Sequence, residues 1–469
     1  MNITSKELIA WNVPNGPEFK LCLTLIESLD ETTWTNEKIK AELEMVFADP
    51  TVKGHPEFDA LRDLVLERRK SDVVEIAEVP KEFALYGGDG IEEGAFRQMN
   101  NAMRLPITKA GALMPDAHQG YGLPIGGVLA TENAIIPYGV GVDIGCRMCL
   151  SVFDIQADFI EANRDYLKTM LNRSTKFGRA TFKKPQDHEV LAHPLFDENP
   201  LLKGLQKKAA EQIGSSGGGN HFVEFGICEI LDENNEWNLS PGKYLSLLSH
   251  SGSRGFGATI ANHYTKLAMA QTKLPDEVRH LAWLDLNSEA GQEYWLAMNL
   301  AGDYASACHH QIHAKVARDL QVEPAARVEN HHNFAWKETL ADGTEVIVHR
   351  KGATPAGKGV LGIIPGSMTA PGFIVRGKGD ASALNSASHG AGRAMSRTQA
   401  KNSLDASEVA KHLKDHGIDL IGSGLDEAPM AYKNIHEVMD AQKDLVDVVG
   451  TFLPKVVRMC GDEFFKEVD

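Results

Sequence analysis

The spacing of hydrophobic and polar positions changes near residue 80. Before that point, apolar residues recur every three or four positions, most clearly in residues 35–50 (TNEKIKAELEMVFADP) and 56–70 (PEFDALRDLVLERRK). This is the spacing of amphipathic helices. Thr35 is a suitable N-cap for the first of them, and Pro50 is a suitable stop. We therefore expect residues 1–80 to form a mainly helical N-terminal extension.

Residues 81–469 mix two periods. Short apolar runs interrupted by glycine predict strands and tight turns over residues 105–153 and 344–379. Helical spacing returns over residues 156–172, 258–320, 404–417 and 435–450. The mixture predicts an α+β fold, in which one large domain contains mixed sheets and surrounding helices.

Composition narrows the class of protein. Hydrophobic residues make up 43% and charged residues 24% of the 469 positions, which is ordinary for a globular protein and excludes a disordered or fibrous chain. No apolar run is long enough for a transmembrane helix, and the first residues do not resemble a secretory signal. The six cysteines are scattered apart from Cys146-Arg147-Met148-Cys149, so we expect reduced thiols, no membrane association and a cytoplasmic location.

The charge is unevenly distributed. The net charge of −16 argues against a general nucleic-acid coat protein, because such binding neutralises phosphates with basic side chains. Residues 346–401, however, hold eight basic residues and ten glycines against the single acid Asp380. We expect this segment to form a surface that meets anions, while the acidic ends of the chain form solvated helical faces.

Glycine-rich loops carry the candidate chemistry. In 139-GVGVDIGC-146, Asp143 and Cys146 could share one metal ion or bridge two, whereas the plainer interpretation is a buried turn with an inert cysteine. The C-x-x-C that begins at Cys146 could also serve redox chemistry or half of a zinc site. A four-cysteine zinc site is excluded, because there is no second C-x-x-C.

Three further loops each hold a histidine: 217-GGGNHFVE-224 (His221), 249-SHSGSRGFG-257 (His250) and 330-NHHNFAW-336 (His331 and His332). Taken singly, such a histidine is more often structural than a metal ligand. Glycine-rich loops nevertheless serve function more often than they serve stability, and several of them occur in this one chain.

His389 begins the glycine turn of 386-SASHGAGRAMSR-397. Backbone N–H groups of such a turn can hold a phosphate, and Arg393 can hold another. His389 could act as a general acid, as a ligand or as a nucleophile that accepts a phosphoryl or nucleotidyl group; the alternative is a helix-capping role. With the loops 116-DAHQGYGLPIGG-127 and 348-VHRKGATPA-356, the set predicts metal-dependent phosphoryl or nucleotidyl transfer.

These motifs, in this order, resemble the RtcB family of RNA-splicing (tRNA-splicing) ligases. The resemblance runs from about Asp116 to Glu437 and also includes AGQEYWLAMNLAGDYA, IPGSM and DEAPMAYKNIHEV. It implies that residues 81–469 form an RtcB-like catalytic domain. The N-terminal residues 1–80 match nothing in it.

The resemblance also implies a site. Cys146 would bridge two Mn²⁺ ions, with His250 and His332 completing the ligands of one ion and Asp143 and His221 those of the other. His389 would become covalently linked to GMP, and Arg254 and Arg393 would face phosphates of the nucleotide or the RNA. The positions implied to bind GTP are Asn220, His221, Phe222, Val223, Glu224, His332, Asn333, Pro365, Gly366, Ser367, Met368, His389, Gly390, Ala391, Gly392 and Tyr432.

The implied activity is Mn²⁺- and GTP-dependent ligation of RNA ends that carry a 3′-phosphate or 2′,3′-cyclic phosphate to 5′-hydroxyl ends, with an archease-like activator as a further partner. At two positions this sequence differs from the residues that contact guanine in the family. The family's serine is replaced by Gly372, and its C-terminal lysine is replaced by Cys460 or, with a shifted alignment, Arg458. One alternative is therefore a divergent paralogue that uses another nucleotide or RNA end. A second is a non-catalytic RNA-binding protein with a relic site.

Overall fold

The computed structural model describes residues 3–71, 73–182, 184–233 and 235–461. The chain divides into two compact units: the first is built from the residues before Ile76, and the second from Ile76 onward. Lys273–Pro275 belongs to the first unit. The domain boundary predicted at residues 80/81 stays a prediction, which folding of separate fragments would test.

The first unit is helical, as the sequence predicts. Thr35 caps the third helix, since its side chain accepts a hydrogen bond from the backbone N–H of Lys38. The apolar faces meet in one core that includes Leu8, Ile39 and Leu61. Its helices are α1 (Ser5–Ala10), α2 (Pro17–Ser28), α3 (Asn36–Ala48), the 3-10 turn η1 (Pro56–Phe58) and α4 (Asp59–Ser71).

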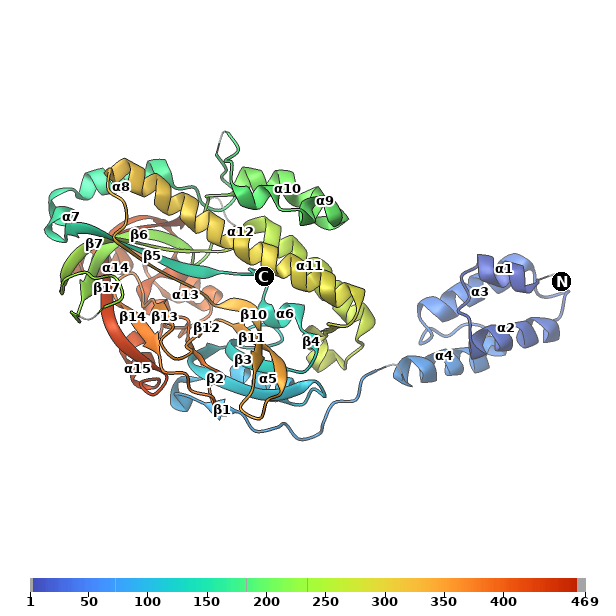
Figure 1. The fold of residues 1–469 in the computed structure, drawn as a ribbon. Helices are drawn as coiled ribbons and strands as arrows, with labels where there is room; N and C mark the ends of the chain where they lie inside the picture. Colours follow the sequence, from blue (N-terminus) through green and yellow to red (C-terminus); the bar gives the residue numbers. More distant parts are fainter. Residues whose placement is uncertain (1–2, 72, 183, 234, 462–469) are drawn as a thin grey trace. The chain divides into compact units, whose positions relative to one another are not determined.

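The second unit contains a five-stranded and an eight-stranded sheet (Figure 1). The five-stranded sheet has the order β1-β2-β3-β11-β10 and is antiparallel except where β1 meets β2. Its strands are β1 (Ala84–Leu85), β2 (Thr108–His118), β3 (Ile125–Thr131), β10 (Asn333–Thr339) and β11 (Glu345–Lys351).

The eight-stranded sheet carries most of the site. Its order is β13-β14-β17-β6-β7-β5-β9, with β16 pairing parallel to β17. The strands are β5 (Arg147–Gln156), β6 (Phe222–Ile230), β7 (Gly242–Ser251), β9 (Ala326–His331), β13 (Leu361–Ile364), β14 (Gly372–Gly377), β16 (Asp419–Ser423) and β17 (Val446–Gly461). Two small ladders pair β4 (Ala134–Ile135) with β8 (Leu284–Asp285), and β12 (Ala353–Pro355) with β15 (Ser386–Ser388).

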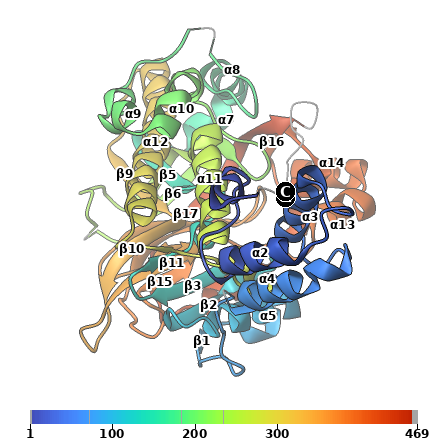
Figure 2. The same cartoon turned by 90° about the vertical axis from the view of Figure 1, so that its right-hand side faces the viewer.

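Helices cover the sheets. The longest, α12 (Glu289–Leu320), lies beside α11 (Arg254–Gln271) in both views (Figures 1 and 2) and packs on β5 and β7. The remaining helices are α5 (Glu93–Met103), α6 (Pro137–Val140), α7 (Asp158–Ala162), α8 (Arg164–Ser174), α9 (Leu195–Glu198), α10 (Pro200–Gln212), α13 (Arg397–Ser403), α14 (Ala406–Asp415) and α15 (Ile435–Asp440). The 3-10 turns are η2 (Gly88–Gly90), η3 (Glu189–Ala192), η4 (Asp276–Leu281), η5 (Leu425–Glu427) and η6 (Pro429–Ala431). Among the described residues, no helix is long and apolar enough to cross a bilayer.

The predicted α+β class and most predicted elements are confirmed, but the helix predicted over residues 435–450 is wrong in its second half. Helix α15 ends at Asp440, and the strand β17 begins at Val446. The valines of 446–449 favour a strand, and β17 pairs with β14 on one side and β6 on the other. Pairing across the sheet outweighs the local helical spacing.

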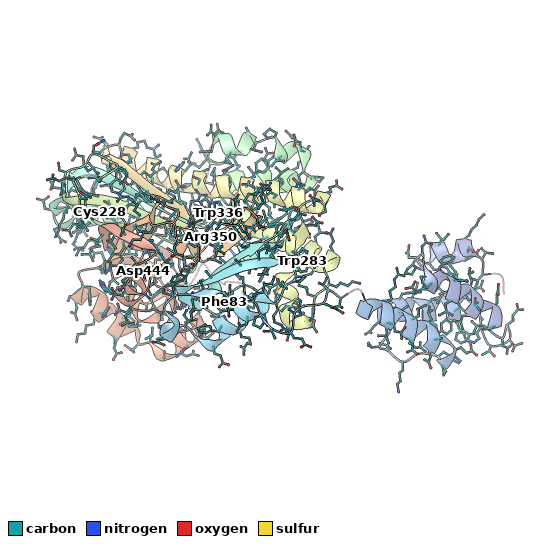
Figure 3. The ribbon with its side chains drawn as sticks, turned by 60° about the horizontal axis from the view of Figure 1, so that its bottom comes forward. Phe83, Cys228, Trp283, Trp336, Arg350 and Asp444 are labelled. Carbon is teal, nitrogen blue, oxygen red and sulfur yellow. The ribbon has the colours of Figure 1, made fainter. Side chains whose placement is uncertain are left out.

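Much of the positive charge of the basic segment 346–401 is paired with carboxylates, while the expectation that the segment meets anions stays a prediction. Arg350 is 1% exposed and lies against Trp336 (Figure 3), with its guanidinium 2.6 Å from Glu338. Most of the other cations also face carboxylates that lie outside the segment: Arg376 with Glu236, Lys378 with Asp447, Arg393 with Glu427, and Arg397 and Lys401 with Asp426. The excess of positive charge along the sequence is therefore largely compensated within the fold.

Candidate active site

One edge of the eight-stranded sheet collects the predicted metal ligands. The neighbouring strands β9, β5, β7 and β6 are antiparallel, so the starts of β5 and β6 lie at the same edge as the ends of β7 and β9. Cys146 precedes β5, His221 precedes β6, His250 is near the end of β7, and His332 follows β9. Four loops distant in sequence therefore deliver their side chains to one place.

The ligand-type atoms face one another at short distances. The Sγ of Cys146 lies 3.3 Å from Nε2 of His221 and 3.2 Å from Nε2 of His250. The Nε2 atoms of His250 and His332 are 3.2 Å apart, and Oδ2 of Asp143 is 3.1 Å from Nε2 of His221. Two ligand atoms that bind one metal ion, each through a bond of about 2.0–2.3 Å, lie at similar distances from each other.

The protonation of these groups suits metal binding. The Nδ1–H of His250 donates to the carbonyl of Asn220 at 3.0 Å, which leaves the Nε2 lone pair toward Cys146. Burial and the neighbouring histidines hold the pKa of His250 and of His332 well below the ordinary value, so both rings are neutral. Burial would raise the pKa of Asp143, but the hydrogen bond and charge of His221 outweigh it and hold this pKa below the usual value.

Two glycines make the close approach possible. A Cβ on Gly252 would lie 2.1 Å from Oδ2 of Asp143, and a Cβ on Gly217 would lie 1.7 Å from Nδ1 of His221. Any larger residue at either position would therefore displace a ligand. The polar neighbour of Oδ2 of Asp143 is Nε2 of His221, and the Nδ1 atoms of His221 and His332 are buried without a hydrogen-bond partner. These two Nδ1 atoms are the outer nitrogens of their rings, whereas the Nε2 atoms face Cys146, His250 and Asp143, so the fit to a divalent ion rests on the converging Nε2, Sγ and Oδ2 atoms.

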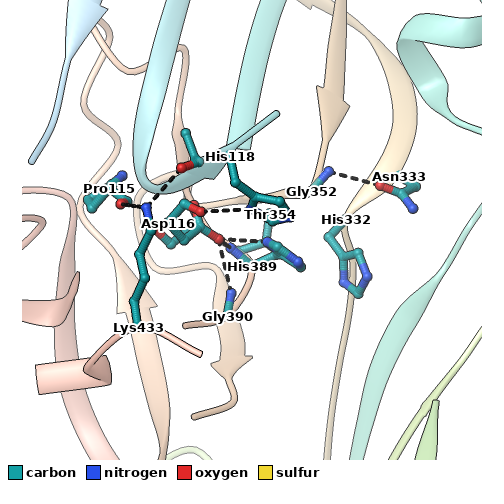
Figure 4. Close-up of polar contacts among 12 residues, drawn as sticks. Pro115, Asp116, His118, His332, Asn333, Gly352, Thr354, His389, Gly390 and Lys433 are labelled. Carbon is teal, nitrogen blue, oxygen red and sulfur yellow. Dashed lines mark hydrogen bonds and ion pairs between the residues drawn. The ribbon is translucent and has the colours of Figure 1, made fainter. Parts of the chain in front are cut away.

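His389 is held by Asp116 (Figure 4). The Oδ2 of Asp116 lies 2.6 Å from Nδ1 of His389 and also accepts the backbone N–H groups of His389 and Gly390 at 3.1 and 3.3 Å. Nδ1 therefore carries the proton, and the lone pair is on Nε2. Burial would raise the pKa of the fully buried Asp116, but the charge and hydrogen bond of His389 hold it below the ordinary value.

The nucleophile candidate adjoins the metal-site candidate. The rings of His389 and His332 are 4.9 Å apart between centroids. Both rings, together with Asp143, Cys146, His221 and His250, line one cavity of about 1020 Å³. The cavity is large enough for a nucleoside triphosphate and the end of a second substrate.

Most residues predicted to bind nucleotide line this cavity, namely Asn220, His221, Phe222, Glu224, His332, Asn333, Pro365, Gly366, Ser367, Met368, His389, Gly390, Ala391, Gly392 and Tyr432. Val223 is the exception. Because side chains alternate along β6, that of Val223 is fully buried in a core with Phe225 and Leu245. Of this residue, only the backbone can contribute to the site.

The two predicted phosphate-contacting arginines also line the cavity but differ in their partners. Arg254 donates to Oγ of Ser215 at 3.3 Å and to the carbonyl of Gly178. Arg393 lies 3.4 Å from Oε2 of Glu427 and stacks 5.4 Å over the ring of Tyr432. The charge of Arg393 is thus partly compensated by a buried carboxylate.

Only one of the two positions at which this chain departs from the family's guanine contacts lines the cavity. Gly372 and Met459 line it, together with Glu224 and the apolar Phe452. Cys460 packs in the core beyond the sheet, and Arg458 donates to the carbonyl of Leu171, so neither side chain lines the cavity. Burial raises the pKa of Glu224 well above its ordinary value. Among these lining residues Glu224 is the polar side chain, beside the apolar Phe452 and Met459.

The sequence places Asp116 in a glycine-rich loop but does not indicate its role. Asp116 and His389 are far apart in sequence, and only the pairing of β2 within its sheet and of β15 with β12 brings them together. Lys351 was likewise counted only as part of the basic segment. Burial lowers its pKa to about 7, and it lines the cavity. The signal available in the sequence was the place of Lys351 at the basic strand end of 348-VHRKGATPA-356.

Comparison with known proteins agrees with this geometry. The sequence profile of the family described as tRNA-splicing ligase RtcB matches residues 98–459. The RNA-splicing ligase RtcB of Escherichia coli (strain K12) is 35% identical over 407 residues, which cover 80% of this chain and 96% of that protein. The tRNA-splicing ligase RtcB of Methanococcus maripaludis is 32% identical over 431 residues, covering 76% and 89%. The protein of the same description from Thermococcus kodakarensis is 29% identical over 421 residues, covering 74% and 87%.

Proposed function

Because the chain belongs to the RtcB family of RNA-splicing ligases, we propose that it is a Mn²⁺- and GTP-dependent RNA ligase. It joins ends with a 3′-phosphate or 2′,3′-cyclic phosphate to 5′-hydroxyl ends through a guanylylated His389. The observation that carries the proposal is the meeting of two features in one cavity: Nε2 of His389, freed by Asp116, and the converging donors around Cys146.

The donor set fits divalent metal ions. Cys146 would bridge two of them, His250 and His332 would complete one, and Asp143 and His221 the other. When bound, the ions polarise phosphoryl oxygens and neutralise the charge that builds up on them. Imidazole and thiolate alone do not select manganese, so the choice of Mn²⁺ rests on the family.

In the first step, Nε2 of His389 attacks the α-phosphorus of GTP, a P–N bond forms and pyrophosphate leaves. Asp116 keeps the ring oriented and stabilises the positive charge that the imidazole gains. The turn Gly390–Gly392 lines the cavity, and because the N–H of Gly390 donates to Asp116, the N–H groups of Ala391 and Gly392 are the ones that would hold phosphate oxygens.

In the next steps, an oxygen of the RNA 3′-phosphate attacks the phosphorus bound to His389, which releases the histidine and forms an activated RNA end. A 2′,3′-cyclic phosphate is first opened by water. The 5′-hydroxyl of the second RNA then attacks the 3′-phosphorus, GMP leaves and a phosphodiester forms. Arg254 and Arg393 line the same cavity and are the side chains that would contact these phosphates.

A nucleotidylation assay tests the proposal. Purified protein is mixed with Mn²⁺ and each α-labelled NTP in turn, with His389→Ala as the control. We expect an acid-labile, base-stable label from GTP that requires His389, followed by ligation of an RNA pair with 2′,3′-cyclic phosphate and 5′-hydroxyl ends. A label that persists in His389→Ala would point to another nucleophile.

The second candidate is a related nucleotidyltransferase that uses another nucleotide or RNA end. It is favoured by Gly372, which lines the cavity where the resemblance implies a guanine-contacting serine, and by Cys460 and Arg458, neither of which lines the cavity although the resemblance implies a guanine-contacting lysine at one of these positions. An adduct formed from ATP, CTP or UTP in preference to GTP would support it. Lack of metal and of any adduct would instead favour a non-catalytic RNA-binding protein.

Two further parts of the proposal concern the cellular setting. We propose a cytoplasmic enzyme, which agrees with the absence of disulfides among the described cysteines. An archease-like activator is the expected protein partner. Ligation measured with and without such a protein tests that partner, and fractionation of cells tests the location.

A further inference from the structure

A second group of ligand-type side chains lies on the opposite face of the eight-stranded sheet. Cys149 on β5 and Ser249 on β7 are register partners in the antiparallel pair. Because side chains alternate along a strand, Ser249 points away from the face that His250 occupies. Cys149 and Ser249 are both fully buried beneath α12.

Helix α12 supplies two histidines to this group. His309 and His313 are four residues apart, so they lie on one face of the helix. The Nδ1 of His309 is 2.6 Å and the Nε2 of His313 is 2.8 Å from the same atom, Oγ of Ser249. The ligand atoms of Cys149, His309 and His313 all lie within 4.8 Å of one another.

The outer nitrogens of both rings have fixed partners. The Nε2 of His309 lies 3.1 Å from the carbonyl of Ser251, and the Nδ1 of His313 lies 2.7 Å from Oγ of Ser151. Metal-bound histidines use their outer N–H in this way. When both outer nitrogens donate, two lone pairs face one point. The single hydroxyl proton of Ser249 can satisfy only one of them.

We propose that Cys149, His309 and His313 bind a further divalent transition metal, with Oγ of Ser249 as the nearest remaining donor. One thiolate and two imidazoles favour zinc. On binding, the Cys149 thiol loses its proton to solvent and a sulfur–metal bond forms, while no redox change occurs. The ion would tie α12 to β5 and β7, the strands that carry Cys146 and His250 at their ends, and so it is structural.

Zinc stoichiometry tests the site. The full chain is stripped with a chelator, reloaded with Zn²⁺ alone, freed of excess metal and analysed by mass spectrometry of the elements. We expect Cys149→Ala to hold one zinc ion per chain fewer than the wild type. The matched control is Cys228→Ala, another buried cysteine of the same sheet (Figure 3), which should hold as much zinc as the wild type. Equal zinc in all three proteins would overturn the proposal.

A titration with Co²⁺ tests the same site without the Cys149→Ala variant, in case that variant does not fold. In the Cys146→Ala protein, the thiolate of the first site is absent. A sulfur-to-cobalt charge-transfer band on addition of Co²⁺ should therefore persist, arising from Cys149. Its absence in a folded Cys146→Ala protein would show that Cys149, His309 and His313 are held by hydrogen bonds alone.

Discussion

The Oδ2 of Asp116 lies 2.6 Å from Nδ1 of His389 and accepts two backbone N–H groups of the same turn. This one carboxylate oxygen thus fixes the tautomer of the His389 ring and the direction in which its Nε2 points. It also holds the backbone conformation of the glycine turn. The carboxylate itself is 0% exposed and has no access to substrate. In the proposed mechanism Asp116 is therefore a positioning residue, which would act on the reaction through His389.

We expect Asp116→Asn to slow formation of the covalent nucleotide adduct by about a hundredfold or more, because the amide removes the charge that stabilises the imidazolium and permits the wrong tautomer. Metal content should not change, since Asp116 contacts none of the metal-ligand candidates. The measurement is a single-turnover rate of adduct formation. An unchanged rate would show that His389 needs no orienting carboxylate.

Cys146→Ala should release bound Mn²⁺, because the thiolate would be shared by both ions and its Sγ faces His221 and His250. Calorimetric titration with Mn²⁺ checks this, with Cys228→Ala as the control for loss of a buried thiol. Binding of unaltered affinity and stoichiometry in Cys146→Ala would contradict the bridging role.

Arg393→Ala should reduce ligation more than metal binding. It should also lower the free energy of unfolding by about 2 kcal/mol, because Glu427 loses a charged partner in a buried position. Arg397, whose guanidinium also contacts Glu427, limits this loss. The double variant Arg393→Ala/Glu427→Gln should recover stability without recovering ligation. Recovery of both would mean that Arg393 serves only the fold.

Lys351 should make stability depend on pH. Burial lowers its pKa to about 7 in the native protein, whereas an unfolded chain keeps the proton to about pH 10. Between these values the unfolded state binds more protons, so the free energy of unfolding should rise with pH, by up to about 1.4 kcal/mol per pH unit.

Lys351→Met should remove this contribution. The variant's advantage in stability over the wild type should be largest at pH 7 and below, and should vanish toward pH 10. Urea unfolding of both proteins across this range measures it, since other titrating groups cancel in the difference. A difference that is constant with pH would show that Lys351 is not buried as a charge.

The sequence was most informative where short motifs carry their own geometry. Several loops can be identified from the sequence as candidate site loops, because glycine next to a chemically active side chain has few structural explanations. These loops hold Asp143, Cys146, His221, His250, His332 and His389. Their mutual distances cannot be predicted in this way, because they depend on the order of β9, β5, β7 and β6. The resemblance to known ligases supplied that link.

Long-range partners set the limit of the prediction. Arg350 was expected to meet anions, but it is neutralised by Glu338 across a strand pair that local composition does not reveal. Val223 belongs to the motif 217-GGGNHFVE-224, but its side chain faces the core because side chains alternate along the strand β6. The roles of Asp116 and of His309 with His313 likewise depend on elements that come together only in the folded chain.

The placement of the ligands at one edge of an antiparallel sheet has a consequence for biosynthesis. Cys146 is translated long before His332. The strand β6, which pairs with β7 on one side, can pair on its other side only after β17 has been synthesised. A ribosome-bound chain that ends before these elements contains the first ligands but not the site. Assembly of the centre therefore waits for contacts of high sequence separation, which form late in folding. Under the proposed mechanism, nucleotide transfer would thereby be confined to chains whose sheet is complete.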